Sequence, residues 1–156
     1  MLNKTANQFT TTGELEHDFW LVNGIRDFAV LPDGVVQKFG ALPIRLHVGT
    51  PSYGGVHIQK HMNKWPKYIE RQGILMADIL YQKLGQTGII YSTESPNKCK
   101  IHLSLLPNAL VILQYRFAGD DQYWSVTSFY PPHNANLDGV KLGRYPGVPG
   151  RNQVQR

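Results

Sequence analysis

Residues 54–68, GGVHIQKHMNKWPKY, bring together histidine and lysine more densely than any other stretch of the chain. His57, Lys60 and His61 follow at i, i+3 and i+4, a spacing that places side chains on one face of a helix. Histidine can give or take a proton near neutral pH, and lysine can stabilise negative charge that develops on a phosphoryl group. Four interpretations are open: an acid–base centre, a metal site, a phosphate-binding surface, or a solvated helix face.

The metal interpretation lacks the residues that it needs. His57 and His61 have the i, i+4 spacing of two zinc ligands on a helix, but the zinc-protease motif requires a glutamate directly after the first histidine. Ile58 stands there instead, and the ammonium group of Lys60 would repel a cation. Cys99 is the only cysteine, so neither an intrachain disulfide nor a cysteine metal cluster can form. We therefore expect no metal and no cofactor.

Cleavage of RNA fits the same residues better. The net charge of +5 favours a polyanionic partner, and residues 57–71 carry four cations against the single acid Glu70. In RNA the 2′-hydroxyl can attack the adjacent phosphorus, so the protein has to supply only a base, an acid and a cation. His57, Lys60 and His61 provide these three types of group.

The elements that position these residues follow from hydrophobic periodicity. A helix is expected over part of 57–64 and again over 66–84, where five apolar residues recur at helical spacing: Leu75, Met76, Ile79, Leu80 and Leu84. The segment 42–49 alternates as a half-buried strand does. Four strand-like runs at 88–92, 100–106, 109–117 and 123–130 are joined by turn residues, which favours antiparallel neighbours. The predicted fold class is α+β, with a helical segment packed on a four-stranded antiparallel sheet.

The chain divides into three predicted segments. Residues 1–40 form a lead-in or N-terminal extension, 41–132 the domain, and 133–156 a basic tail rich in Gly and Pro. No run of apolar residues reaches the roughly 20 needed for a membrane span. The N-terminus lacks the apolar region of a classical signal peptide.

The order of motifs resembles that of a known nuclease superfamily. GGVHIQKH precedes an amphipathic helix, and four strands follow that end in SVTSFYPP. This arrangement is similar to the barnase/EndoU/colicin E5-D/RelE-like (BECR) nucleases, and most of all to their phage-associated and contact-dependent toxin branches. The resemblance covers roughly residues 44–132 and rests on short motifs. It makes 41–132 a nuclease-like domain.

The resemblance assigns roles to individual residues. His57 and His61 become the acid–base pair, Lys60 the cation at the phosphate, and Thr127, Ser128 and Tyr130 the sheet wall of the cleft. Because successive side chains of a strand point to opposite faces, Thr127 and Ser128 cannot both face the cleft. Which histidine is the base stays open, and the glutamate base of barnase-like members has no counterpart here. Further RNA contacts are expected at Lys64, Lys67, Arg71, Arg116 and Trp124.

The expected function is a metal-independent RNA endonuclease toxin that acts on tRNA and leaves a 2′,3′-cyclic phosphate. The resemblance implies a cognate immunity protein or antitoxin as partner, and action in the cytoplasm of a target cell. The alternative is a non-catalytic RNA-binding or phage structural module with the same fold.

Overall fold

The computed structural model describes residues 7–36, 39–65, 75–105, 108–131 and 139–151. A small two-stranded sheet near the N-terminus consists of β1 (Phe9–Thr11) and β2 (Trp20–Val22). The large sheet contains β3 (Ala29–Leu31), β4 (Leu42–Arg45), β5 (Gly88–Ser92), β6 (Lys98–Leu103), β7 (Ala109–Ala118), β8 (Asp121–Tyr130) and β9 (Lys141–Tyr145). The described helices are α1 (Gly54–Lys60), the 3-10 turn η1 (Met62–Lys64) and α3 (Met76–Lys83).

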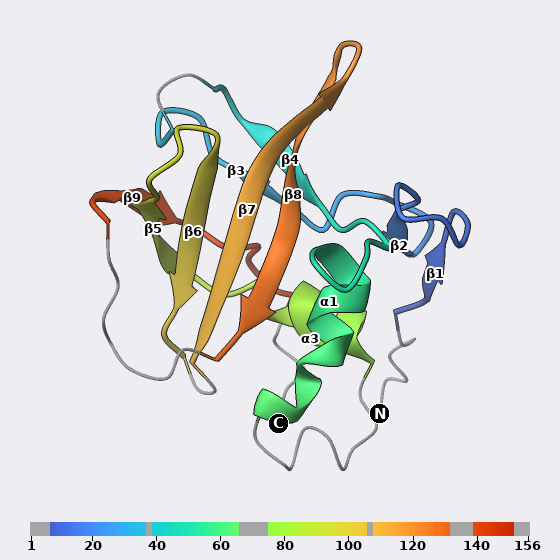
Figure 1. Cartoon of the computed structure of the whole chain (residues 1–156). Helices are drawn as coiled ribbons and strands as arrows, with labels where there is room; N and C mark the ends of the chain where they lie inside the picture. Colours follow the sequence, from blue (N-terminus) through green and yellow to red (C-terminus); the bar gives the residue numbers. More distant parts are fainter. Residues whose placement is uncertain (1–6, 37–38, 66–74, 106–107, 132–138, 152–156) are drawn as a thin grey trace.

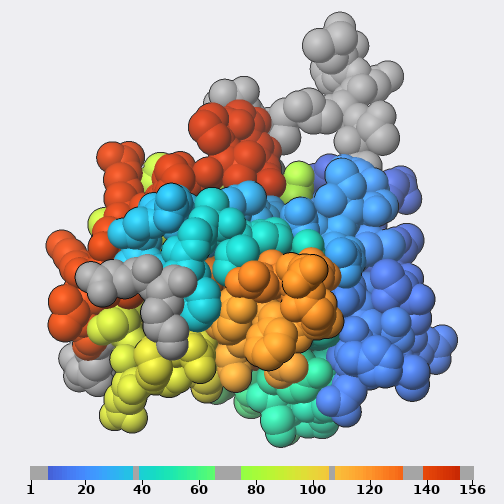
Figure 2. All heavy atoms as spheres, turned by 90° about the horizontal axis from the view of Figure 1, so that it is seen from above, coloured from blue at the N-terminus to red at the C-terminus, as the bar shows by residue number. Residues whose placement is uncertain are grey.

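The large sheet is seven-stranded, mixed and curled, with the order β3-β4-β8-β7-β6-β5-β9 (Figure 1). All neighbours are antiparallel except β4 and β8, which run parallel with Ile44 opposite Trp124. Helix α1 lies against β8. Seen from above, the N-terminal segment lies beside the tip of the β7–β8 hairpin (blue and orange in Figure 2), where Arg26 forms an ion pair with Asp121.

The predicted fold class, a helical segment on a four-stranded antiparallel sheet, is wrong. The four predicted runs do form β5 to β8, and these strands pair antiparallel. The sheet does not end with them, because β4 and β3 extend it beyond β8, and β9 extends it beyond β5. Among the described residues, helix is limited to short pieces: α1 ends at Lys60, and the described part of the long helix expected over 66–84 is helical at Met76–Lys83. The sheet thus draws strands from all three predicted segments.

The sheet has one buried face and one half-exposed face. On β6, Cys99, Ile101 and Leu103 are fully buried, whereas Lys98, Lys100 and His102 alternate with them and are half-exposed. The buried face carries the core, which also includes residues of the neighbouring strands and of α3: Val111, Leu113, Trp124, Val126, Phe129, Leu80 and Leu84. We call the other side, which holds Lys98, Lys100 and His102, the open face.

A β-bulge sets which residues of β8 reach the open face. The pairing with β7 changes from Ile112–Ser128 to Leu113–Val126, so Thr127 is an extra residue on β8. Bulges of this kind re-aim side chains. Ser128 has Ile112 as its cross-strand neighbour, while Thr127 is buried and its hydroxyl donates to the Ile112 carbonyl at 3.2 Å.

Glycines allow α1 to begin directly against the segment that follows β4. The backbone N–H groups of Gly55 and Val56 donate to the carbonyls of His47 and Val48, each at 2.9 Å. Gly54 has φ of 76°, in the left-handed region that favours glycine. A Cβ on Gly55 would lie 2.7 Å from the indole nitrogen of Trp20. The glycine pair therefore fixes where the histidine-bearing helix starts.

Candidate functional site

A small cleft lies between α1 with its following turn and the end of β8. His57 and His61 line one wall together with Lys64, and Ser128 and Tyr130 line the other. The cleft has a volume of about 150 Å³. The residues come from segments about 70 positions apart in the sequence, which meet because α1 packs on β8. Of the six predicted catalytic residues, the fold gathers His57, His61, Ser128 and Tyr130 around this cleft.

The imidazole of His57 is held in one orientation. Its Nδ1 lies 2.8 Å from the carbonyl oxygen of Pro51. A carbonyl can only accept a hydrogen bond, so Nδ1 carries the hydrogen and donates it. Nε2 is then the ring atom that is available to gain or lose a proton.

His61 lies next to His57, and its surroundings disfavour the charged form. The ring centroids are 4.9 Å apart, and the ring planes meet at 72°, so the edge of one ring faces the other. Loss of solvation lowers the pKa of His61 from its ordinary value, and the positive charges of Lys64, His57 and Lys60 lower it further. The surroundings of His61 therefore favour the neutral imidazole, which is the form that a general base needs.

The two lysines of this region face different hollows. Lys64, in η1, lines the histidine cleft. Lys60 lines a separate, mainly apolar hollow with Trp20, Val48 and Met76. The change from α-helix to 3-10 turn after Lys60 brings Lys64 to the cleft. The lysine that the fold places beside the histidines is thus Lys64 and not Lys60.

The sheet wall of the cleft is made by alternate residues of β8. Ser128 and Tyr130 are half-exposed and line the cleft. Thr127 points into the sheet, where its hydroxyl bonds to a backbone carbonyl. Of the two neighbours Thr127 and Ser128, which were expected to point to opposite faces, Ser128 is the one that faces the cleft.

The remaining predicted RNA-binding residues do not line the histidine cleft in the described part of the chain. Lys67 and Arg71 lie outside the described residues. Trp124 is fully buried and packs edge-on against Phe39 and Tyr115, so its indole is part of the core. The guanidinium of Arg116 lies 4.9 Å from the centre of the Tyr53 ring.

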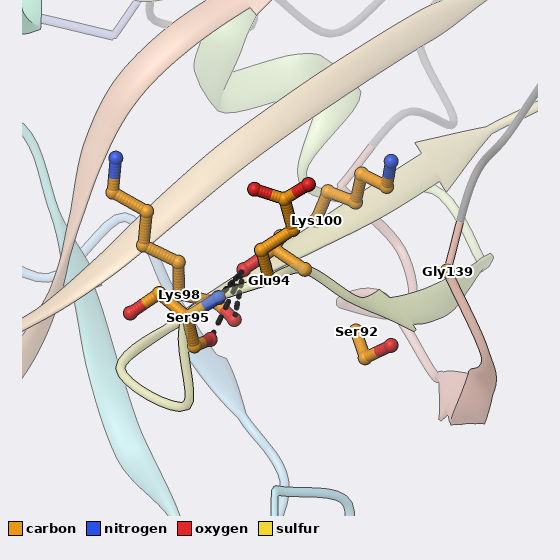
Figure 3. A pocket seen from close by; sticks show the side chains of 7 residues that line it. Ser92, Glu94, Ser95, Lys98, Lys100 and Gly139 are labelled. Carbon is orange, nitrogen blue, oxygen red and sulfur yellow. Dashed lines mark hydrogen bonds between the residues drawn. The ribbon is translucent and has the colours of Figure 1, made fainter.

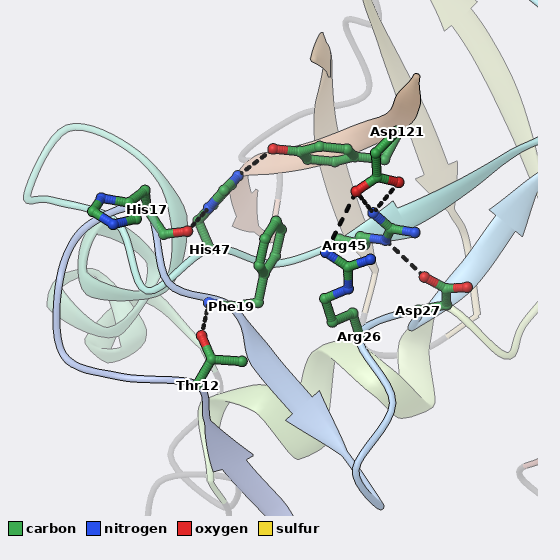
Figure 4. Close-up of polar contacts among 9 residues, drawn as sticks. Thr12, His17, Phe19, Arg26, Asp27, Arg45, His47 and Asp121 are labelled. Atoms are coloured by element: carbon green, nitrogen blue, oxygen red, sulfur yellow. Dashed lines mark hydrogen bonds and ion pairs between the residues drawn. The ribbon is translucent and has the colours of Figure 1, made fainter. Parts of the chain in front are cut away.

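A buried polar network that the sequence did not point to lies beside the start of α1 (Figure 4). His47 is 4% exposed; its Nδ1 donates to the carbonyl of His17 at 3.0 Å, and its Nε2 accepts from the Tyr123 hydroxyl at 2.7 Å. Phe19 stacks on the His47 ring at 4.2 Å. Burial lowers the pKa of His47, and the charge of Arg116 adds to this effect. In the sequence, His47 stands at a polar position of the alternating segment 42–49. That pattern gave no sign that its ring is buried.

Arg45 extends this network on β4. Its guanidinium donates to Asp27 at 2.7 Å and to Asp121 at 2.9 and 3.0 Å (Figure 4). The side chain is 8% exposed, and the charge-assisted hydrogen bonds offset the cost of burying it. Together, Arg45 and His47 tie the N-terminal segment to β8. They support the position of α1, because the same segment of chain, 45–48, accepts the first hydrogen bonds of that helix.

Within the described ranges, no three His, Cys, Asp or Glu side chains come together as a metal-binding group. No helix in the described part of the chain is long and apolar enough to cross a membrane. Comparisons of the chain with protein-family models, with curated proteins and with solved structures find no match. The geometry of the cleft is therefore the guide to function.

Proposed function

We propose that the protein is a metal-independent RNA endonuclease that cleaves by attack of the 2′-hydroxyl on the adjacent phosphorus. One observation carries the proposal: two adjacent histidines and a lysine line a small cleft whose opposite wall bears two hydroxyl groups. Acid–base groups, a cation and hydroxyl donors are what transesterification of a phosphodiester requires.

His61 acts as the base in this mechanism. As a neutral imidazole it takes the proton of the 2′-hydroxyl while the 2′-oxygen forms its bond to phosphorus. Negative charge grows on the non-bridging phosphoryl oxygens, and the ammonium group of Lys64 lies on the same cleft to stabilise it.

His57 acts as the acid. Its Nδ1–H stays bonded to the Pro51 carbonyl, and its Nε2–H gives a proton to the departing 5′-oxygen as the bond from phosphorus to that oxygen breaks. The products are a 2′,3′-cyclic phosphate and a 5′-hydroxyl. Ser128 and Tyr130 contact the phosphate or ribose from the sheet side, and a tyrosine ring can also stack on a base.

The biological setting of the proposal comes from the resemblance of the motifs. It makes the protein a toxin that acts on tRNA in the cytoplasm of a target cell and is restrained by an immunity protein or antitoxin. The net charge of +5 suits both RNA and an acidic inhibitor. The alternative, an RNA-binding module without catalysis, is favoured by the basic residues on the open face, since these bind phosphate whether or not cleavage follows.

Incubation of the purified protein with total tRNA in the presence of EDTA tests the proposal. The expected result is discrete fragments that end in 2′,3′-cyclic phosphate, and loss of these fragments for the His57→Ala and His61→Ala variants. RNA binding without any cleavage would support the alternative module. Cleavage that stops in EDTA, or that both variants retain in full, would contradict the proposed site.

A further inference from the structure

A lysine-lined hollow lies around the β5–β6 turn (Figure 3), towards the β9 edge of the sheet and away from β8, on which α1 packs. It has a volume of about 510 Å³ and is lined by Ser92, Thr93, Glu94, Ser95, Lys98, Lys100 and Gly139. A second hollow of about 420 Å³ shares Lys98 and three residues of the turn, and adds Lys141 of β9. We call this joined region the lysine hollow. Its three cations face the single acid Glu94.

Hydrogen bonds of the turn fix the floor of the lysine hollow. The Thr93 hydroxyl contacts the carbonyls of Ser95 and Lys98 at 3.0 and 3.1 Å. The hydroxyl of Ser92 accepts from the backbone N–H of Val140 at 2.9 Å, which joins the turn to the segment before β9. The Thr93 hydroxyl hydrogen is used within the turn, and the Ser92 hydroxyl also holds the backbone, so the positive charge that attracts an anionic ligand comes from the lysines.

Within the described part of the chain, Lys98 and Lys100 are unpaired. Among the described residues, neither Lys98 nor Lys100 has a carboxylate within ion-pair distance. Figure 3 shows Glu94 between them, with the two ammonium groups directed to either side of it. Two unpaired ammonium groups on a fixed floor make a site for anionic groups that are spaced along a chain.

The register of the sheet connects the lysine hollow to the histidine cleft. Lys100 is opposite Ile112 on β7, and Ile112 is opposite Ser128 on β8, so the three side chains form one row on the open face. Ser128 lines the histidine cleft, and Lys100 lines the lysine hollow. Because adjacent strands are 4.7–4.9 Å apart, the two ends of the row are separated by about 10 Å. One extended strand of RNA can therefore reach both.

We propose that Lys98 and Lys100 form a second phosphate site, which holds the substrate strand next to the bond that is cut. This inference rests on the proposed function. The strand crosses the open face along the row from Ser128 to Lys100, and Tyr91, opposite Lys100 on β5, extends the row with an aromatic ring on which a base can stack. The site makes the substrate class an extended single strand several nucleotides long, because a dinucleotide in the cleft would not reach the lysines.

Binding of a single-stranded oligonucleotide that carries 2′-O-methyl groups at every position tests this site without cleavage. The Lys98→Gln/Lys100→Gln variant removes both charges and keeps polar side chains with part of the apolar stems. When log affinity is plotted against log salt concentration, the slope should become less negative by about 1.4. This is about 0.7 for each phosphate contact that is lost on a single strand. Lys98→Arg/Lys100→Arg is the matched control and should keep the wild-type slope. Glu94→Gln should bind more tightly than wild type.

The outcomes separate this site from the proposed function. An unchanged slope and affinity for the double glutamine variant would overturn the second phosphate site, even if the protein cuts RNA. The same result, combined with lysine-dependent binding of polyglutamate, would instead make the hollow a docking site for an acidic protein. If binding depends on the lysines as expected but RNA is never cut, the second phosphate site holds and the proposed function fails.

Discussion

The ring centroid of His61 lies 4.9 Å from that of His57, with Lys64 on the same wall of the cleft. This arrangement lowers the pKa of His61 and so favours its neutral form, because solvation is reduced and a further positive charge beside Lys64, His57 and Lys60 is unfavourable. In the proposed mechanism, this difference makes His61 the base and His57 the acid.

The pH dependence of cleavage follows from this assignment. Because the pKa of His61 is lowered from 6.5, kcat/KM should decrease towards acidic pH with a midpoint below pH 6.5. His61→Ala should reduce kcat/KM by about 10²–10⁴-fold and remove that limb. The profile is measured with a short RNA at constant ionic strength. An acidic limb that persists unchanged in His61→Ala would show that another group is the base.

Lys64 should matter more for cleavage than Lys60. Lys64 lines the histidine cleft, whereas Lys60 lines the hollow formed with Trp20 and Met76. Lys64→Ala should therefore lower kcat with a smaller effect on KM, since the lysine stabilises charge that develops in the transition state. Lys60→Ala is the matched control, with a smaller loss of kcat. Equal losses of kcat, or a larger loss for Lys60→Ala, would contradict this placement.

The burial of His47 should make the stability of the protein depend on pH. Burial holds the pKa of His47 below its ordinary value of 6.5. The unfolded chain then binds more protons than the folded protein in this range, so the free energy of unfolding should fall as the pH drops from 6.5 through the lowered pKa. Urea unfolding between pH 7.5 and 5 measures the effect, and His47→Gln should flatten the dependence. The same slope in His47→Gln and wild type would rule out this ring as the source.

Tyr123→Phe examines the His47–Tyr123 hydrogen bond at constant pH. It removes the donor to a buried imidazole nitrogen, which should cost about 1–3 kcal/mol of the free energy of unfolding. Tyr115→Phe is a suitable control, because the Tyr115 hydroxyl bonds to Gln122 at an exposed position. A loss for Tyr123→Phe no greater than that for the control would contradict a structural role of this bond.

Sequence periodicity revealed local elements but not their arrangement. The alternation on β6 and the apolar run of β7 identified two neighbouring strands, because side-chain burial along a strand is a local property. The parallel pairing of β4 with β8 joins residues such as Arg45 and Asp121, which are 76 positions apart, and no local pattern encodes it.

The same limit applied to the candidate site. His57 and His61 could be found from helical spacing, and Ser128 and Tyr130 from the terminal motif. The position of Lys64 depends on the turn from α1 into η1, and that of Thr127 on the bulge opposite β7. The burial of His47 depends on Phe19 and Tyr123, which come from two distant segments. These features arise from tertiary packing, which the spacing of residues does not record.

The glycine pair at the start of α1 should control the position of the histidines. Gly54→Ala places a side chain at φ of 76°, which should destabilise the protein by about 1–2 kcal/mol. Because α1 begins there, cleavage should also decrease. Gly119→Ala is the control: its φ of 62° carries a similar strain at the distant β7–β8 turn, with no atom within 4 Å of the added Cβ. If the two variants lose the same cleavage rate for each kcal/mol of lost stability, Gly54 has no special role in positioning the site.

The most direct measurement concerns the attacking group. A short RNA that the protein cuts at a mapped bond is synthesised again with one 2′-deoxynucleotide on the 5′ side of that bond, and both RNAs are incubated with the protein in EDTA. We expect cleavage at the substituted bond to disappear and the unmodified RNA to give a 2′,3′-cyclic phosphate. Continued cleavage at the substituted bond would mean that water or a protein side chain attacks the phosphorus, and would contradict the role assigned to His57 and His61.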